Sequence, residues 1–336
     1  MIAEVSGPQA ADDRNSRPPR RWVSVLVWLA VAPFAGWAVL RTIPADVDFR
    51  WVQLVGFTPY VAPASIVAVI TALASRRWTA LAVSLMSTAT LAAHVLPRAL
   101  PAGGHTTGPP LRVLTSNLLK GSVPGPALID LVRRLRPDVL TLQELTPSAA
   151  AELKRDGLEG LLPYKVDRSR PGVGGSGIYA RFPVTPDEAI ELGGFGQARA
   201  SVDVPGAGPV EIVSVHPCAP RYENRFACWA EGLAALSGRP RASSVLAGDF
   251  NATLDHAPTR RLLAEGYHDA ADTMGQGLAT TWPYQPWHFN GFAIPPVTLD
   301  HVLAGPGVGV RAFGVHRLPV TDHHAVFAEL VLPPAT

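Results

Sequence analysis

Residues 244–251 read Ser-Val-Leu-Ala-Gly-Asp-Phe-Asn, a short apolar segment that ends in two polar side chains, Asp249 and Asn251. Short segments rich in apolar residues and bounded by turn residues are typical of buried strands. Alternate residues of an extended chain point the same way, so Asp249 and Asn251 are expected to share one side while Phe250 packs inward. The stretch therefore predicts a core strand that ends in candidate functional side chains.

Other apolar segments of the same kind also end in ionisable or amide side chains. Groups at the tips of neighbouring strands converge on one cleft, which a sheet holds rigidly. A set rich in carboxylates suits Mg²⁺ or Mn²⁺ better than Zn²⁺, which prefers His and Cys. We therefore expect one metal-dependent site. Its candidate residues are Asn117, Glu144, His216, Asp249, Asn251, Asp300, Asp322 and His323.

Taken in chain order, the polar strings form a recognisable set. They are Ser116–Asn117, Leu142–Leu145, Gly177–Val184, Ser214–His216, Gly248–Asn251, Leu299–His301 and Asp322–His324. This ordered set resembles the endonuclease/exonuclease/phosphatase superfamily of DNase-I-like metal-dependent phosphoesterases. The resemblance covers roughly residues 110–332 and implies an α/β fold, a four-layer α/β/β/α sandwich. Strand signals that alternate with helix signals, and cluster toward the C-terminus, independently suggest two packed sheets covered by helices.

The resemblance implies that Asn117, Glu144 and Asp322 hold the metal ion, Mg²⁺ or Mn²⁺. Arg199 and Arg225 are candidate substrate residues, because a guanidinium group binds phosphate oxygens through parallel hydrogen bonds. We expect these two arginines to hold the phosphate group of the substrate.

Five catalytic residues are also implied by the resemblance. Asp249 would position or deprotonate the attacking water, and Asn251 would bind the phosphate. Asp300 would orient His323, since a carboxylate beside an imidazole fixes its tautomer and raises its basicity. His216 would contact the phosphoryl group or protonate the leaving oxygen. Together these groups fit an enzyme that hydrolyses phosphoric ester or pyrophosphate bonds by in-line attack of water.

Three long apolar segments precede this region. None contains Asp, Glu, Lys or Arg, and each is long enough to cross a bilayer as a helix, which takes about 20 residues. They are Trp22–Leu40, Trp51–Ser75 and Trp78–Pro97. We expect three transmembrane helices; the alternative for the first segment is a cleaved signal peptide.

The chain is expected to have four parts along its length. These are a disordered cytoplasmic tail at 1–21, a membrane domain at 22–100, a linker at 101–110 and an extracytoplasmic catalytic domain at 111–334. The orientation follows from the basic residues, which favour the cytoplasmic side of a membrane. Arg20 and Arg21 precede the first apolar segment, and Arg76 and Arg77 join the second to the third.

The charge of the two halves bears on the substrate. Residues 1–104 hold 9 Lys and Arg against 5 Asp and Glu, whereas residues 105–336 hold 20 against 22. A slightly acidic catalytic region lacks the basic surface expected of a nucleic-acid binder. We therefore expect the partners to be a bilayer and a membrane lipid or lipid-linked phosphate. The alternatives are an extracytoplasmic nuclease, a phospholipase C or sphingomyelinase-like phosphodiesterase, and a non-catalytic membrane binding protein.

The chain has two cysteines, Cys218 and Cys228, both after the apolar segments. Outside the cell they would be able to form a disulfide that closes a small loop after His216. Two free buried thiols are the alternative, and their spacing matches no zinc pattern.

Overall fold

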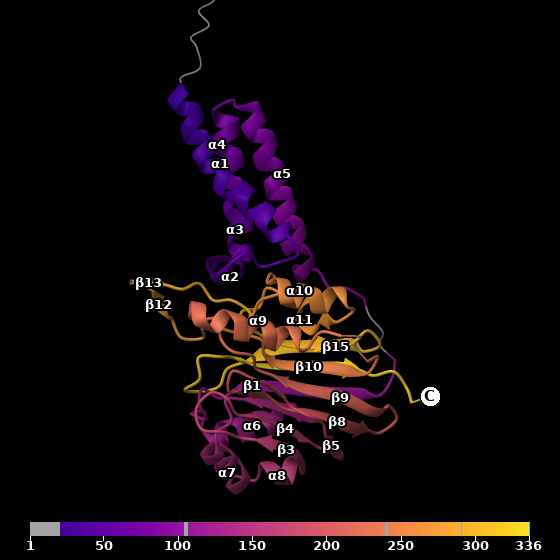
Figure 1. The fold of residues 1–336 in the computed structure, drawn as a ribbon. Coiled ribbons are helices and arrows are strands. Elements are labelled where there is room, and N and C mark those ends of the chain that lie inside the picture. Colours follow the sequence, from indigo (N-terminus) through magenta and orange to yellow (C-terminus); the bar gives the residue numbers. More distant parts are fainter. Residues whose placement is uncertain (1–20, 104–106, 239–240, 290, 336) are drawn as a thin grey trace, which may run out of the picture.

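The computed structural model describes residues 21–335 apart from 104–106, 239–240 and 290. The predicted tail at 1–21 lies outside the described residues except for Arg21. A bundle of N-terminal helices stands on a sandwich of two sheets (Figure 1). The predicted mixed α/β sandwich is therefore confirmed.

The described strands build two six-stranded sheets and two short hairpins. The first sheet has the order β15 (Gly309–His316), β16 (Ala325–Val331), β1 (Pro110–Asn117), β2 (Val139–Gln143), β4 (Ser176–Ala180) and β3 (Tyr164–Arg168). The second has the order β11 (His268–Asp269), β14 (Asp300–Ala304), β10 (Ser244–Asp249), β9 (Gly208–Val215), β8 (Arg199–Val204) and β5 (Val184–Pro186). The hairpins are β6 (Ile190–Leu192) with β7 (Phe195–Gln197), and β12 (His288–Phe289) with β13 (Phe292–Ala293).

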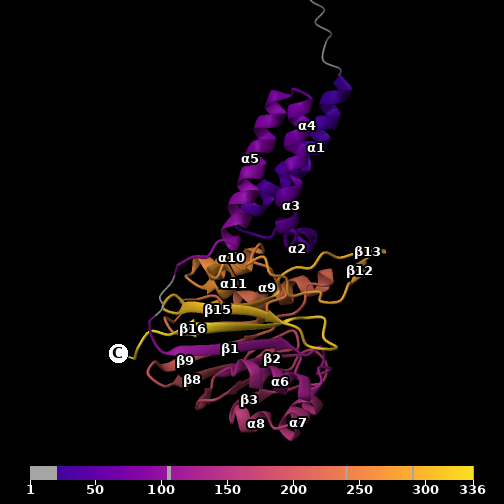
Figure 2. The same cartoon turned by 180° about the vertical axis from the view of Figure 1, so that it is seen from behind.

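Three apolar clusters define the layers of the sandwich. The central cluster joins the inner faces of the two sheets. A second cluster packs the first sheet against α6 (Gly125–Leu135), α7 (Pro147–Arg155) and α8 (Leu158–Leu161). A third packs the second sheet against α9 (Phe226–Ala234), which follows the short turn η2 (Glu223–Arg225), and against α10 (Ala257–Ala264). The helices thus lie on both outer faces, as Figure 2 shows from behind.

Strand pairing explains why the polar strings meet. β1 and β2 are parallel, with Asn117 opposite Gln143, so the residues that follow both strands emerge at the same edge. β9 and β10 are parallel in the other sheet. β14 runs antiparallel to β10 and places Asp300 directly opposite Asp249. β14 begins at Asp300, and Val297, three residues earlier, bridges to Trp282 in a loop.

The N-terminal bundle contains α1 (Arg21–Thr42), α2 (Phe49–Val55), α3 (Thr58–Ala64), α4 (Ile66–Ala74), α5 (Trp78–Val95) and the short turn η1 (Leu96–Ala99). Among the described residues, two helical segments, Arg21–Thr42 and Trp78–Ala99, are long and apolar enough to cross a membrane. The second expected span is not one straight helix, because α2 meets the rest of it at 68°. Pro59 lies in the first turn of α3, where proline is tolerated, whereas in the interior of one continuous helix it would remove a hydrogen bond.

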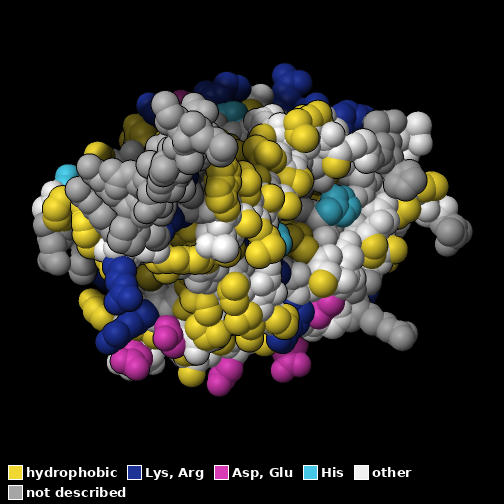
Figure 3. Space-filling model, turned by 90° about the horizontal axis from the view of Figure 1, so that it is seen from above, with side chains coloured by type: hydrophobic (Ala, Val, Ile, Leu, Met, Phe, Trp, Pro, Cys, Tyr) yellow, Lys and Arg dark blue, Asp and Glu magenta, His cyan; other side chains and the backbone are white. Residues whose placement is uncertain are grey.

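The outer surface of the bundle is apolar. Leu29, Val67 and Met86 expose 64%, 61% and 66% of their surface, which is unusual for large hydrophobic side chains in a water-soluble bundle. Figure 3 shows the molecule from above, along the bundle. Hydrophobic side chains lie over the middle of this view, and charged side chains lie mainly toward its edge. The bundle therefore has the surface expected of helices that contact lipid.

A buried ion cluster fastens the bundle to the sandwich. Asp255, in the turn before α10, is fully buried and accepts from Arg41 Nε at 2.7 Å. The same carboxylate accepts from both terminal nitrogens of Arg98, at 2.9 and 2.7 Å. Arg41 lies at the end of α1 and Arg98 in the turn after α5. Val52 of α2 adds an apolar contact to the cluster under α9 and α10.

Candidate active site

Asp249 lies at the centre of the group formed by the strand ends. Its side chain is buried, and its Oδ2 accepts from Asn117 Nδ2 at 3.0 Å. The same oxygen lies 3.7 Å from His216 Nε2 and 3.6 Å from His323 Nε2. Burial, the largest effect, raises the pKa of Asp249, and His323 partly opposes this. Side chains from the end of β1, from the residue after β9 and from the segment before β16 therefore converge on the carboxylate at the end of β10.

Asp300 and His323 form a close pair beside Asp249. His323 Nδ1 lies 2.9 Å from Asp300 Oδ2, and both side chains are buried. Burial acts against the charged imidazolium, but Asp300 and Asp249 outweigh it and raise the pKa of His323 to about 10. One ligand atom from each of the three residues lies within 4.8 Å of the others. The predicted orientation of His323 by Asp300 matches this geometry.

Glu144 contacts the same side-chain nitrogen of Asn117 that donates to Asp249. Asn117 Nδ2 is 3.4 Å from Glu144 Oε1, and the backbone N–H of Lys120 donates to Glu144 Oε2 at 2.7 Å. Burial raises the pKa of Glu144. Its φ of 55° is a left-handed conformation that L-residues rarely adopt, and such conformations gather at functional sites.

Asp322 is held by an indole from the loop before β14. Trp282 Nε1 donates to Asp322 Oδ2 at 3.0 Å, and the second carboxylate oxygen is buried without a hydrogen-bond partner. Asp300 Oδ1 is likewise buried and unpaired. A bound cation would satisfy these buried oxygens, which have no hydrogen-bond donor and lie beside carboxylates with raised pKa values. Oxygen-rich donors therefore fit a hard divalent metal ion.

His216 and Asn251 complete the group. Burial lowers the pKa of His216 to about 4, so its imidazole is neutral near pH 7. The backbone N–H of Asn251 donates to Asp249 Oδ1 at 2.8 Å, and its side-chain Nδ2 donates to Pro217 O at 3.2 Å. Asn251 also has a left-handed φ of 49°. Hydrogen bonds and close polar contacts thus connect seven of the eight strand-end candidates around Asn117 and Asp249. The eighth, Asp322, is next to His323 in the sequence and is bonded to Trp282.

The contacts of the two candidate substrate arginines are made with residues outside this group. Arg199 forms an ion pair with Glu211, its Nε lying 2.6 Å from the carboxylate. Glu211 pairs with Ser244 at the start of β10, the end remote from Asp249, so Arg199 lies away from the strand ends. Arg225 is exposed and donates to Gly193 O at 3.4 Å.

Sequence reasoning missed three residues that support the site. Thr321 Oγ1 donates to Asn117 O and accepts from the backbone N–H of His323. Thr281 Oγ1 accepts from the backbone N–H of Asp300. Trp282 donates to Asp322, which is 40 residues away in the sequence, and this bond has no signal in the sequence.

His301 and the two cysteines lie beside the site. His301 is buried between Asp269 Oδ2 and Ala252 O at 2.9 and 3.0 Å. The open question of the cysteines is answered by a disulfide between Cys218 and Cys228, whose Cα atoms lie 5.8 Å apart.

Comparisons with known proteins agree with this geometry. The model of the endonuclease/exonuclease/phosphatase family matches residues 114–323. An endonuclease/exonuclease/phosphatase from Beutenbergia cavernae DSM 12333 is 20% identical with a TM-score of 0.51, over 67% of this chain and 72% of that chain. A humanized TDP2 from D. rerio is 18% identical with a TM-score of 0.51, over 66% and 98%. A family protein from Leptotrichia buccalis C-1013-b is 16% identical with a TM-score of 0.50, over 66% and 99%.

A search of curated proteins gave no match. The solved structures establish likeness of fold, and the family model covers more than half of the sequence. Members of that family are metal-dependent hydrolases of phosphoester bonds. The chain belongs to the endonuclease/exonuclease/phosphatase family.

Proposed function

We propose that this protein is a membrane-anchored, Mg²⁺-dependent phosphohydrolase that acts on a lipid-linked phosphate or pyrophosphate outside the cytoplasm. One observation carries the proposal: the apolar bundle contacts both loops that border the candidate site. Gln53 of α2 donates to Pro220 O at 2.5 Å, in the loop after His216. Tyr60 of α3 donates to Pro296 O at 2.6 Å, in the loop before Asp300.

A bilayer around the bundle would therefore lie next to the loops of the site. A substrate whose phosphate is linked to a lipid is confined to that surface, whereas a soluble substrate gains nothing from such an anchor. The slightly acidic catalytic region supports the same choice over nucleic acid.

The chemistry proposed is hydrolysis. A water oxygen attacks phosphorus, and the bond from phosphorus to the leaving oxygen breaks, so that a pyrophosphate yields a lipid monophosphate and inorganic phosphate. Asp249 orients the water and accepts its proton, and the Asp300–His323 pair stabilises charge on the phosphoryl group. Asn117, Glu144 and Asp322 would hold Mg²⁺, which neutralises phosphoryl oxygens when bound.

The proposed orientation rests on the direction of the helices. α1 and α5 both end at the sandwich, while Arg76 and Arg77, between α4 and α5, lie at the far end of the bundle (Figure 1). Basic residues at the end remote from the sandwich support a cytoplasmic N-terminus and an outward catalytic domain. A reporter fused after residue 336 should be active only in its extracytoplasmic form, and a strong cytoplasmic signal would reverse the orientation.

The architecture resembles VanJ, an actinobacterial membrane protein associated with teicoplanin resistance. That resemblance favours undecaprenyl pyrophosphate, a lipid intermediate of cell-wall synthesis, as substrate, and a role in resistance to glycopeptide antibiotics. No side chain in the site identifies the lipid by itself.

The test is a comparison of substrates with the purified full chain in vesicles. Undecaprenyl pyrophosphate, phospholipid and DNA are offered at equal enzyme concentration, with Mg²⁺ or with excess chelator, and Glu144→Ala serves as the inactive control. We expect Mg²⁺-dependent release of phosphate from the lipid pyrophosphate. Faster cleavage of DNA or phospholipid than of the pyrophosphate would overturn the proposal, as would a catalytically silent protein.

A further inference from the structure

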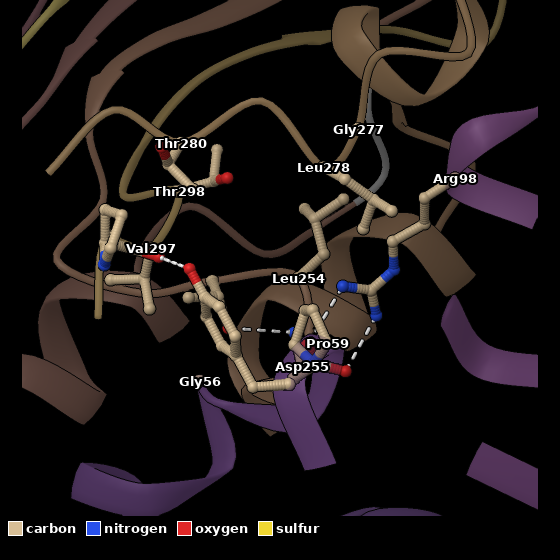
Figure 4. A pocket seen from close by; sticks show the side chains of 13 residues that line it. Gly56, Pro59, Arg98, Leu254, Asp255, Gly277, Leu278, Thr280, Val297 and Thr298 are labelled. Atoms are coloured by element: carbon tan, nitrogen blue, oxygen red, sulfur yellow. Dashed lines mark hydrogen bonds and ion pairs between the residues drawn. The ribbon is translucent and has the colours of Figure 1, made fainter. Parts of the chain in front are cut away.

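A cavity of about 200 Å³ lies where the bundle meets the sandwich (Figure 4). Gly56, Pro59 and Tyr60, from the break in the second apolar segment, form its membrane-side wall. Leu254, Leu278 and Val297 line it from the sandwich. Tyr60 and Leu278 are 41% and 40% exposed, so the cavity opens to the surroundings at these residues.

Each sandwich segment that lines the cavity leads directly into the candidate site. Thr253 follows Asn251 by two residues, and Thr298 precedes Asp300 by two. Thr280 precedes Trp282, the partner of Asp322, by two residues. Three separate segments therefore connect the cavity to the site along the chain, and two segments of the bundle, at Gly56–Tyr60 and at Arg98, also line it.

Most polar side chains of the cavity are already paired with protein. Arg98 and Asp255 bind each other through two hydrogen bonds, drawn as dashed lines in Figure 4. Thr298 Oγ1 donates to Ala279 O at 2.8 Å. What remains for a ligand is mainly apolar contact. A charged or polar ligand would lose its hydration without gaining partners, whereas a hydrocarbon has none to lose.

The apolar lining is continuous with the outer surface of the bundle. Leu54, Tyr60 and Ile66, which surround the break, expose 48%, 41% and 50% of their surface. We propose that the cavity binds the part of the substrate's hydrocarbon chain that lies next to the phosphate. This inference rests on the proposed function, and it assigns the break in the second span to recognition of the lipid.

The test compares three pyrophosphates that differ in their hydrocarbon chain: inorganic pyrophosphate, which has none, farnesyl pyrophosphate and undecaprenyl pyrophosphate. The full-length protein in vesicles is assayed as wild type, Leu278→Trp, which fills the cavity, and Tyr60→Ala, which removes one wall. Leu85→Trp is the matched control, because Leu85 is a half-exposed leucine on α5 that does not line the cavity. Thermal unfolding of every variant establishes that it is folded.

We expect both cavity variants to lower kcat/KM for the farnesyl and undecaprenyl substrates about tenfold, the scale for a disturbed apolar subsite. Turnover of inorganic pyrophosphate should change less than about twofold in both cavity variants, because it has no chain for the cavity to bind, and Leu85→Trp should change less than about twofold on every substrate. Equal losses on all three substrates, or none, would overturn the inference while leaving the proposed function standing. If the wild type itself shows no preference for longer chains, the proposed lipid substrate fails first.

Discussion

Removing the carboxylate of Asp255 should strongly destabilise the protein. In Asp255→Ala, the guanidinium groups of Arg41 and Arg98 stay buried at 4% and 7% exposure and lose the charge that both contact. Breaking a buried ion pair by removing one partner costs about 3–5 kcal/mol. For a domain of this size that lowers the melting temperature by about 6 to 20 °C.

Thermal unfolding of the full chain in detergent, followed by tryptophan fluorescence, measures the effect. Asp130→Ala is the matched control, because Asp130 also pairs with an arginine, Arg133, but both side chains are more than half exposed. An exposed pair of this kind contributes about 0.2–1 kcal/mol, so the control should melt close to wild type. If Asp255→Ala melted like Asp130→Ala, the ion cluster would not hold the bundle to the sandwich.

Acidity provides a second check on the same cluster. Burial alone would raise the pKa of Asp255, but Arg98 and Arg41 outweigh it and lower the pKa below 3.8. A lowered carboxylate pKa gives stability that is present above the unfolded value and is lost as the pH falls through the folded one. The difference between wild type and Asp255→Ala should therefore persist from neutral pH down to about pH 4 and shrink below it.

Three further outcomes are expected. Glu144→Ala should lower kcat about a hundredfold or more, because Glu144 would hold the metal ion. The melting temperature should change little, since this residue lies at a strand end outside the core. Activity that survives both this change and excess chelator would contradict the prediction. His323→Ala should lower kcat about 10²–10⁴-fold, and Asp300→Asn combined with it should add little, because the two act as one unit; losses that multiply in the double mutant would show them independent. Burial and Asp269 raise the pKa of Asp272 to about 7, so stability should fall as pH rises from about 4 to 7, and Asp272→Asn should melt higher than wild type at pH 8 but not at pH 4; equal melting curves at pH 8 would refute this.

The sequence predicted which strand-end side chains lie together where local pattern and strand geometry coincide. Each strand-end string combines a buried segment with a polar end, and parallel pairing of β1 with β2 and of β9 with β10 brings such ends together. Strand register across the sheet is not local, so the sequence did not show where Arg199 would lie. Its partner Glu211 lies on the neighbouring strand and satisfies the guanidinium that was expected to bind phosphate.

The junction of bundle and sandwich was also beyond the sequence. Arg41 is 214 residues from Asp255 and Arg98 is 157, so no spacing rule connects them. The break in the second apolar segment had a weak signal in Pro59 and Pro63, yet composition alone favoured one long helix. On one side of the break, α2 contacts the sandwich, where Val52 is buried among residues of another layer.

The shared attachment of Arg41 and Arg98 to one carboxylate has a mechanical consequence. A domain attached to one helix can rotate about that attachment. The sandwich is attached to both α1 and α5, so its tilt and height relative to the bundle are fixed. Within the bilayer proposed for the bundle, the catalytic cleft would stay at a constant elevation above the lipid head groups. The protein would then select phosphate groups by their height above the bilayer. It would reach phosphates at that level and would not reach those that lie deeper or project farther.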